Sequence, residues 1–198
     1  MYGWNFNASL FLPFKSLQVL ILSQNYITGW TKIEGFDKLS HLTNLKVLDL
    51  QHNYLHPSVL SSVCWISSLE VLRLGGFTGG PTTGKGSAKC PGLSNLRVLL
   101  LEGYGINDIS VLSALGLATH IGRKNLEKLY LSENSFNSNI FSSLKDLPSL
   151  THLDLSYNEI DENIEMSGLL ISPFNHILLH YDFNCTTEHL NYLPISNT

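Results

Sequence analysis

The segment from residue 79 to residue 86 could bind phosphate by its composition. It reads Gly-Gly-Pro-Thr-Thr-Gly-Lys-Gly, within one residue of the phosphate-binding loop G-x-x-x-x-G-K-[ST]. The missing residue is the Ser or Thr whose hydroxyl binds the metal ion, and Pro91 follows too soon for the helix that would present its N-terminus to phosphate. We therefore expect residues 78–90 to form a surface loop of turn-forming residues, or else a flap that contacts a ligand.

Histidine and cysteine spacings could also indicate a metal site. His52 and His56 lie four residues apart but on a turn, where solvated side chains are expected. A second set near the C-terminus would need a long helix, against which Pro173 argues: His176, His180, Cys185 and His189. No G-x-S-x-G motif or other arrangement nominates a nucleophile. The sequence therefore predicts a protein that is not an enzyme and has no metal site and no cofactor.

An internal repeat predicts the elements that position the remaining side chains. The chain of 198 residues contains 37 Leu, 23 Ser and 17 Asn, a bias typical of a repeated unit. The template L-x-x-L-x-L-x-x-N-x-L begins, with spacings of 28, 24, 27, 30 and 24 residues, at Leu17, Leu45, Leu69, Leu96, Leu126 and Leu150. The mean period of about 27 residues is that of leucine-rich repeats. A seventh, poorly fitting unit would place Phe174, Ile177 and Leu179 at the leucine positions.

The L-x-L triplet predicts the architecture. Its two leucines point to one side of a short strand and the intervening residue to the other, so stacked repeats form a parallel sheet over a leucine core. Apolar residues three and four apart predict 3₁₀ or short helical turns on the return path, as at Phe36, Leu39 and Leu42; at Val59, Val63 and Ile66; and at Ile140, Leu144 and Leu147. We expect an α/β solenoid, a horseshoe with the parallel sheet on its concave face and loops, 3₁₀ turns and short helices on its convex side. Residues 1–170 form the repeat domain, and residues 171–198 a degenerate repeat or an irregular tail.

The asparagine of the template has a structural role in this prediction. An inward amide at the turn after each strand can hydrogen-bond backbone groups that the turn leaves unpaired. The candidates for such a ladder are Asn25, Asn53, Asn134 and Asn158. Phe77 and Tyr104 occupy this position in the third and fourth repeats, where we expect the turns to be satisfied otherwise, for example by water, and to be irregular.

The outward positions of the strands are the candidate ligand-binding surface. They comprise Ile21, Ser23, Asp49, Gln51, Arg73, Glu102, Tyr130, Glu133, Asp154 and Tyr157. Asp49 and Arg73 are expected to form an exposed ion pair that contributes about 0–1 kcal/mol. A stripe of valines lies beside them, at Val19, Val47, Val71 and Val98. The stripe and the tyrosines indicate a contact surface for a peptide or protein, although strand propensity alone also explains the valines.

Net charge, cysteines and glycosylation motifs bear on the class of ligand and on the cellular compartment. A net charge of −4 argues against a basic nucleic-acid-binding face. Cys64 and Cys90 occupy nearly the same phase of adjacent repeats and could form a disulfide if their Cα atoms lie within about 7 Å. Asn7 and Asn184 begin glycosylation triplets, which also arise by chance in such a composition. We find no signal peptide, no membrane span and no capping repeat, and so expect a chain of marginal solubility or a part of something longer.

The chain resembles the ectodomain of plant leucine-rich-repeat receptor-like proteins over about residues 3–170. The stretch from Asn7 to Phe14, the Leu-Asp-Leu triplets at 48–50 and 153–155, and Glu34-Gly35-Phe36 support this resemblance. It implies a non-catalytic recognition module on the extracellular side of the plasma membrane, in defence or developmental signalling, with a peptide or protein ligand and a co-receptor kinase. The alternatives are a truncated product without autonomous activity, the repeat domain of an intracellular immune receptor, and an inhibitor of a secreted wall-degrading enzyme.

Overall fold

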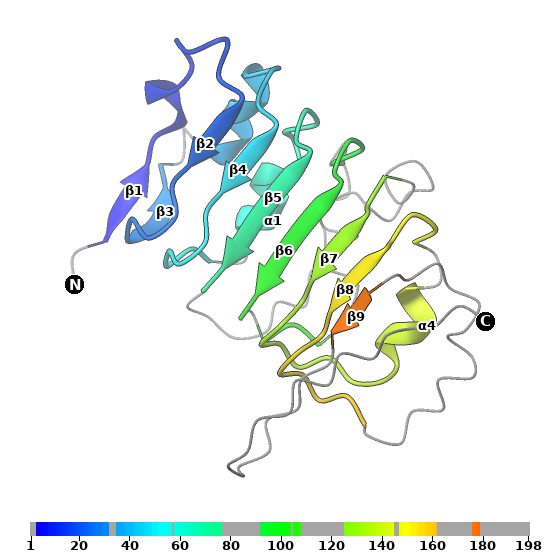
Figure 1. Cartoon of the computed structure of the whole chain (residues 1–198). Coiled ribbons are helices and arrows are strands. Elements are labelled where there is room, and N and C mark those ends of the chain that lie inside the picture. The colour runs from blue at the N-terminus through cyan, green and yellow to red at the C-terminus, as the bar shows by residue number, and fades with distance from the viewer. Residues whose placement is uncertain are drawn as a thin grey trace.

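The computed structural model describes the chain over residues 3–31, 35–56, 58–76, 92–103, 105–107, 125–144, 147–161 and 176–178 (Figure 1). Its main element is a parallel sheet of seven strands in the order β2-β4-β5-β6-β7-β8-β9. The strands span Val19–Ile21, Val47–Asp49, Val71–Gly75, Val98–Glu102, Lys128–Tyr130, His152–Asp154 and His176–Leu178, respectively. Each repeat thus contributes one strand that pairs with the strand of the next repeat, as the sequence predicts.

The pairing register follows the leucine template throughout the sheet. Leu20 lies opposite Leu48, Leu48 opposite Leu72, and Leu72 opposite Leu99. The same register continues to β9, where Ile177 lies opposite Leu153. The strand predicted for the seventh unit therefore forms, because its apolar residue takes the place of the second leucine.

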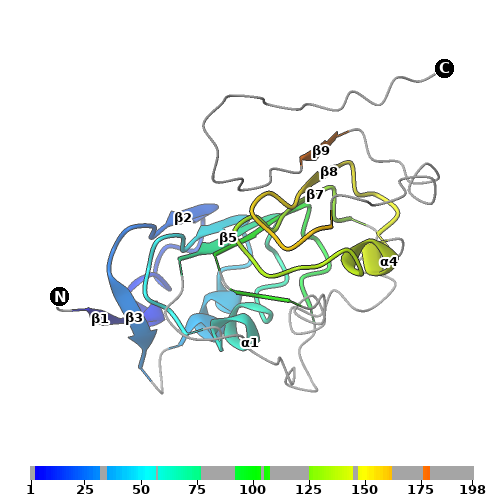
Figure 2. The same ribbon diagram turned by 90° about the horizontal axis from the view of Figure 1, so that it is seen from below.

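Short helices form the return path on the side away from the sheet (Figure 2). The 3₁₀ helices η1 and η2 span Ala8–Leu10 and Phe36–His41, and the α-helices α1 and α4 span Val59–Val63 and Ile140–Leu144. Three of these four elements coincide with the apolar spacings read from the sequence. They are short because each return path must close within one repeat.

A second, two-stranded parallel sheet was not predicted. It pairs β1 (Trp4–Phe6) with β3 (Ile27–Trp30), which follows the turn of the first full repeat. Residues 3–15 therefore provide the return path of a repeat that packs against the repeat beginning at Leu17. Phe6 is completely buried and stacks on Phe36, with 4.3 Å between the ring centroids.

The core is a continuous stack of leucines between the sheet and the return path. All three template leucines are completely buried in the repeats beginning at Leu45, Leu69 and Leu96. Burial of a leucine side chain is worth roughly 1.5–3 kcal/mol, so this stack is the main stabilising feature of the solenoid. Because each repeat contacts only its neighbours, the side chains outside the stack are positioned repeat by repeat.

The asparagine ladder forms at three of the four predicted positions. The Asn53 side chain accepts from the backbone N–H groups of Asn25 and Ile27 and donates to the carbonyl of Leu22, all in the preceding repeat. Asn134 and Asn158 repeat this pattern. Asn25 differs, because its side chain is exposed and donates only to Ser23 within its own turn. Each ladder amide bonds the turn that precedes it, and no such turn lies next to Asn25 in the described part of the chain.

A row of backbone bonds supplements the ladder. The residue just before the asparagine position has a positive φ in all six repeats, at Gln24, His52, Gly76, Gly103, Glu133 and Tyr157. Five of these residues donate their N–H to a carbonyl of the next repeat. In the two repeats without asparagine this residue is glycine, which adopts the left-handed conformation without a steric penalty. Backbone bonds therefore help to hold both turns, and the turn of the fourth repeat is also bonded by the Asn134 amide at Leu101 and Ile106. Phe77 and Tyr104 themselves lie outside the described residues.

Candidate recognition surface

The residue between the second and third leucines of each repeat projects from the open face of the sheet. These residues form one row in pairing register: Ile21, Asp49, Arg73, Leu100, Tyr130 and Asp154. Adjacent strands lie about 4.8 Å apart, so neighbouring side chains in this row are within contact distance. The sheet therefore brings together side chains that are 24 to 30 residues apart in the sequence.

Asp49 and Arg73 form the ion pair that the sequence predicts, but Asp49 is not exposed. Its Oδ2 lies 3.3 Å from Nη1 of Arg73, and the exposed fraction of its side chain is 10%, against 41% for Arg73. Asp49 Oδ1 also accepts from the backbone N–H of Gln51. The strand position projects outward, yet the turn folds over the carboxylate, and this bond fixes the carboxylate in place. Asp49 therefore positions the Arg73 side chain and the turn, and little of its own carboxylate is exposed to contact a ligand.

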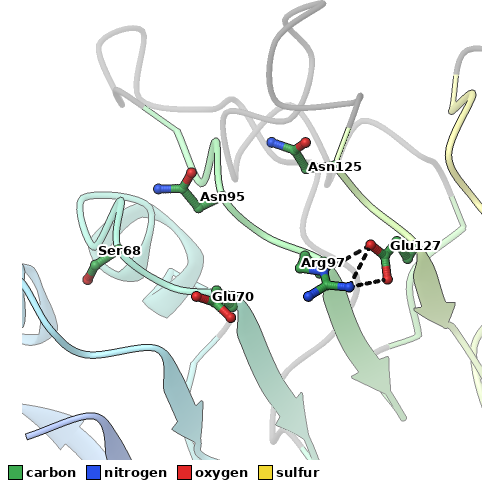
Figure 3. A pocket seen from close by; sticks show the side chains of 6 residues that line it. All are labelled: Ser68, Glu70, Asn95, Arg97, Asn125 and Glu127. Carbon is green, nitrogen blue, oxygen red and sulfur yellow. Dashed lines mark hydrogen bonds and ion pairs between the residues drawn. The ribbon is translucent and has the colours of Figure 1, made fainter.

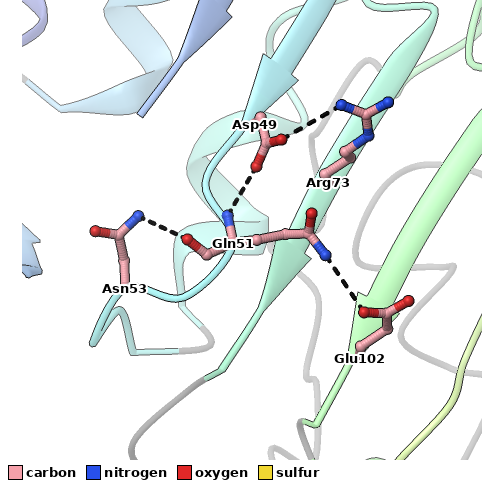
Figure 4. A network of polar contacts seen from close by, with 5 residues as sticks. All are labelled: Asp49, Gln51, Asn53, Arg73 and Glu102. Atoms are coloured by element: carbon pink, nitrogen blue, oxygen red, sulfur yellow. Dashed lines mark hydrogen bonds and ion pairs between the residues drawn. The ribbon is translucent and has the colours of Figure 1, made fainter. Parts of the chain in front are cut away.

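A side-chain bridge crosses the third repeat. Nε2 of Gln51 donates to Oε2 of Glu102 over 3.3 Å, although these residues belong to the second and fourth repeats (Figure 4). The intervening residue is Gly75, where an added Cβ would lie 3.2 Å from the Glu102 carbonyl and 3.9 Å from Gln51 Cγ. Because glycine has no side chain, the two long side chains can meet above it.

The electrostatic environment of Glu102 is unfavourable for its negative charge. Burial raises its pKa above the ordinary glutamate value, and the nearby carboxylates of Asp154 and Glu133 raise it further. His52 and a hydrogen bond with Ser132 act in the opposite direction. The three carboxylates are in no ion pair within the described part of the chain. This end of the open face is therefore strongly acidic.

The other predicted contact residues differ in accessibility. Ile21 is 61% exposed and Tyr157 is 44% exposed, whereas Tyr130 is half-buried. Ser23 is half-buried and Glu133 is exposed. Asp154 is bonded locally, because its Oδ1 accepts from the backbone and the hydroxyl of Ser156. Five of the ten predicted residues therefore share one row of the sheet: Ile21, Asp49, Arg73, Tyr130 and Asp154. The linked group of Asp49, Arg73, Gln51 and Glu102 joins the second, third and fourth repeats.

A row of charged side chains borders this face and was missed in the sequence. It occupies the position after the first leucine in the second to fifth repeats and alternates in sign: Lys46, Glu70, Arg97 and Glu127. Lys46 Nζ lies 2.8 Å from Glu70 Oε1, and Arg97 binds both oxygens of Glu127 at 2.9 and 3.0 Å. These contacts lower the pKa of Glu70 and raise that of Arg97. The alternating charge at this position of the repeat is visible in the sequence and could have predicted the row of ion pairs.

A shallow polar groove of about 310 Å³ lies along this row (Figure 3). Its lining is Ser68, Glu70, Asn95, Arg97, Asn125 and Glu127. Asn95 and Asn125 donate to carbonyls of the preceding repeat, at Ser67 and Ser94. Asn44 does the same to Lys15. A second asparagine row thus ties the repeats together at the amino ends of the strands.

Other predicted sites lie partly outside the described residues. Cys64 is completely buried and disulfide-bonded, and its predicted partner Cys90 is not among the described residues. Asn7 begins η1 and its Oδ1 accepts from the backbone N–H of Ser9. Asn184 and the predicted loop at 78–90 also lie outside the residues that the structure describes.

Neither a metal site nor a membrane span is found where the chain is described. Among the described residues, His, Cys, Asp and Glu form no group of three or more that could hold a metal ion. Over the same residues, the helices are too short or too polar to cross a bilayer.

Comparison with known proteins agrees with this architecture. The Leucine Rich Repeat family pattern matches residues 44–67, 125–147 and 149–177. The chain is 60% identical to Cuscuta receptor 1 of Solanum lycopersicum over 176 residues, which is 85% of this chain and 15% of that protein. It is 38% identical to Receptor-like protein 9a of Arabidopsis thaliana over 102 residues, 51% of this chain and 11% of that protein. The chain therefore spans a small part of these relatives.

Two solved structures show the same fold at low identity. A leucine-rich-repeat protein of Leptospira interrogans superimposes with a TM-score of 0.61 at 23% identity, covering 88% of this chain and 40% of that one. Human trophoblast glycoprotein gives a TM-score of 0.53 at 23% identity, covering 83% of this chain and 59% of its own. With the repeat, the parallel sheet and these relatives taken together, the chain belongs to the plant leucine-rich-repeat receptor-like proteins.

Proposed function

We propose that this chain is a non-catalytic recognition module whose open sheet face binds a peptide or protein ligand. The observation that carries the proposal is the linked group of Asp49, Arg73, Gln51 and Glu102 in the middle of a face that also presents Tyr130. Polar side chains fixed by each other lose little conformational freedom on binding, which favours affinity. Tyrosines are enriched among the residues that dominate binding energy.

The setting we propose is the cell surface of a plant. A disulfide at Cys64 is typical of an oxidising compartment, which favours an extracellular receptor over an intracellular immune receptor. The tomato relative is named a Cuscuta receptor, and recognition of another organism is a defence role, which we propose ahead of a developmental one. Signalling would then require a co-receptor kinase, since we assign no catalytic residue to this chain.

The ligand-binding proposal is tested by selecting binders from a random peptide library displayed on phage. The full chain is immobilised, and selected peptides are measured against the Tyr130→Ala and Tyr157→Ala variants. We expect these variants to lose at least about tenfold in affinity, as for other aromatic anchors. Tyr54→Ala is the matched control, because Tyr54 is also exposed but lies after the turn and stacks on Tyr26. Equal binding to all three variants would place the ligand elsewhere and refute the proposal.

The compartment is tested separately by glycan occupancy. When the chain is secreted from plant cells, Asn7 should carry a glycan that Asn7→Gln removes, seen as a mass shift. Absence of a glycan from secreted, folded protein would remove this support for an extracellular setting.

A further inference from the structure

The valine stripe of the open face has a spacing that selects one peptide conformation. We define the stripe as Val19, Val47, Val71 and Val98, which are direct pairing partners on β2, β4, β5 and β6. Their side chains are partly exposed, and Val19 is 48% exposed. A ligand that crosses the strands meets one valine about every 4.8 Å, and every second valine about every 9.6 Å.

The polyproline II helix matches this spacing. It has three residues per turn and rises about 3.1 Å per residue, so the same side recurs about every 9.3 Å. Residues i, i+3 and i+6 of such a peptide would lie over the first, third and fifth repeats. In an extended strand the same side recurs about every 6.8 Å, which matches neither one strand interval nor two.

The width of the stripe argues against an α-helix as the occupant. On one side lies the charged row of Lys46, Glu70, Arg97 and Glu127, and on the other lie Asp49 and Arg73. Glu70 and Arg73 are three residues apart on the strand, which is about 10 Å between their Cα atoms. An α-helix with its side chains is about 10–12 Å wide, so it would collide with these long, ion-paired side chains.

Charge specifies one end of the occupant. The stripe continues in register from Val98 to Lys128, which is half-buried and in no ion pair within the described part of the chain. The nearest sequence neighbour of opposite charge, Glu127, is already bound by Arg97. Lys128 can therefore receive a carboxylate at the end of the stripe. From Val19 to Lys128 there are four strand intervals, about 19 Å, which about seven residues of polyproline II helix span.

We propose that the valine stripe binds a proline-rich peptide in the polyproline II conformation, with apolar residues over Val19 and Val71 and a carboxylate over Lys128. The carboxylate comes from an acidic side chain or from the C-terminus of the peptide. This inference rests on the proposed function, since it names the class of ligand for the same face.

The test uses short fluorescent peptides and the full chain, measured by fluorescence anisotropy. The probe is Val-Pro-Pro-Val-Pro-Pro-Glu, and its period control is Val-Pro-Val-Pro-Pro-Pro-Glu, which has the same composition. We expect the probe to bind at least about tenfold more tightly than the period control. Three further versions of the probe identify the carboxylate that pairs with Lys128. One has an amidated C-terminus, one has Gln in place of Glu, and one has both changes and so shows the affinity lost when neither carboxylate is present.

A charge reversal tests the position of the carboxylate. Lys128→Glu should weaken binding of the probe at least about tenfold, as expected for loss of a charge-assisted bond, and strengthen binding of a peptide ending in Lys. Lys38→Glu is the matched control, because Lys38 is exposed on η2 on the return path. Circular dichroism verifies that both variants fold.

The outcomes separate this inference from the proposed function. Equal binding of probe and period control, or no effect of Lys128→Glu, overturns the inference. If library peptides still bind in a manner that depends on Tyr130 and Tyr157 while the probe does not bind, the inference fails and the proposed function stands. If neither the library nor the probe yields binding at this face, both are refuted.

Discussion

Replacing Asn53 by Ala should remove one of the most strongly bonded side chains of the solenoid. Asn53 is 2% exposed and makes five hydrogen bonds to backbone groups. Three of these bonds are buried, to Ile27 N–H and to the carbonyls of Leu22 and Leu50. A buried backbone group that loses its partner costs about 1–3 kcal/mol, and the two bonds nearer the surface can be replaced by water. We therefore expect the free energy of unfolding to fall by at least about 3 kcal/mol, the sum of the lower values for the three buried groups.

The chain contains a matched control for this substitution. Asn25 occupies the same position of the repeat but is exposed and donates a single side-chain bond to Ser23. Asn25→Ala should therefore cost less than about 0.5 kcal/mol. Asn53→Asp keeps the acceptor for the two N–H groups but directs a charged oxygen at the carbonyls of Leu22 and Leu50, so it should be at least as destabilising as Asn53→Ala.

Urea unfolding followed by far-ultraviolet circular dichroism measures these differences, with equal m-values as the condition for comparison. The reasoning is refuted if Asn53→Ala and Asn25→Ala cost the same, or if Asn53→Asp is as stable as the original chain. Either result would mean that the Asn53 side chain stabilises the fold only through its volume or through bonds within its own turn, and not through its bonds to the preceding repeat.

Three further predictions concern charge, the disulfide and the turns. Because burial and nearby carboxylates raise the pKa of Glu102, the stability it contributes is present below the ordinary glutamate value and is lost as pH rises through the raised pKa. Glu102→Gln should therefore raise the free energy of unfolding at about pH 7 and not at about pH 4. Urea unfolding at both pH values measures this, and an equal change in the free energy of unfolding at the two pH values would contradict it. Cys64→Ser should lower the free energy of unfolding by about 2–4 kcal/mol, and Cys90→Ser should match it if these residues are partners. Gly76→Ala should cost about 1–2 kcal/mol because of its positive φ, and more than Gly103→Ala, since an added Cβ at Gly76 would lie 3.2 Å from backbone; equal melting temperatures would argue against that contact.

Much of the fold could be predicted because burial imposes a strict period on the sequence. The positions of Leu20, Leu48 and Leu72 predict both the strands and their register, since a one-residue slip would expose every leucine. The return-path helices follow in the same way from apolar spacing, as at Val59 and Val63. The placement of the variable residues on one face of the sheet then follows from the alternation of strand side chains.

The state of individual polar residues could not be predicted, because it depends on the neighbouring repeat. Asn25 and Asn53 have the same place in the template, yet only Asn53 has a preceding turn beside it to bond. Asp49 reads as an outward strand residue, but the backbone of Gln51 folds onto its carboxylate. Such differences arise from contacts between residues about one repeat apart, which the motif of a single repeat does not contain.

The sequence by itself determined the period, the parallel sheet, the leucine core and the face on which variable side chains are displayed. Only the tertiary structure decided that Gln51 reaches Glu102 across Gly75 and that Lys46 and Arg97 are held by the acids of the next repeat. It also decided that Asn134 bonds the turn of the fourth repeat, which has no asparagine of its own. The physical reason is that burial of leucine is non-directional and follows from residue type and spacing alone. Hydrogen bonds and ion pairs need a partner at a defined distance and angle, and that partner is supplied only when the repeats stack.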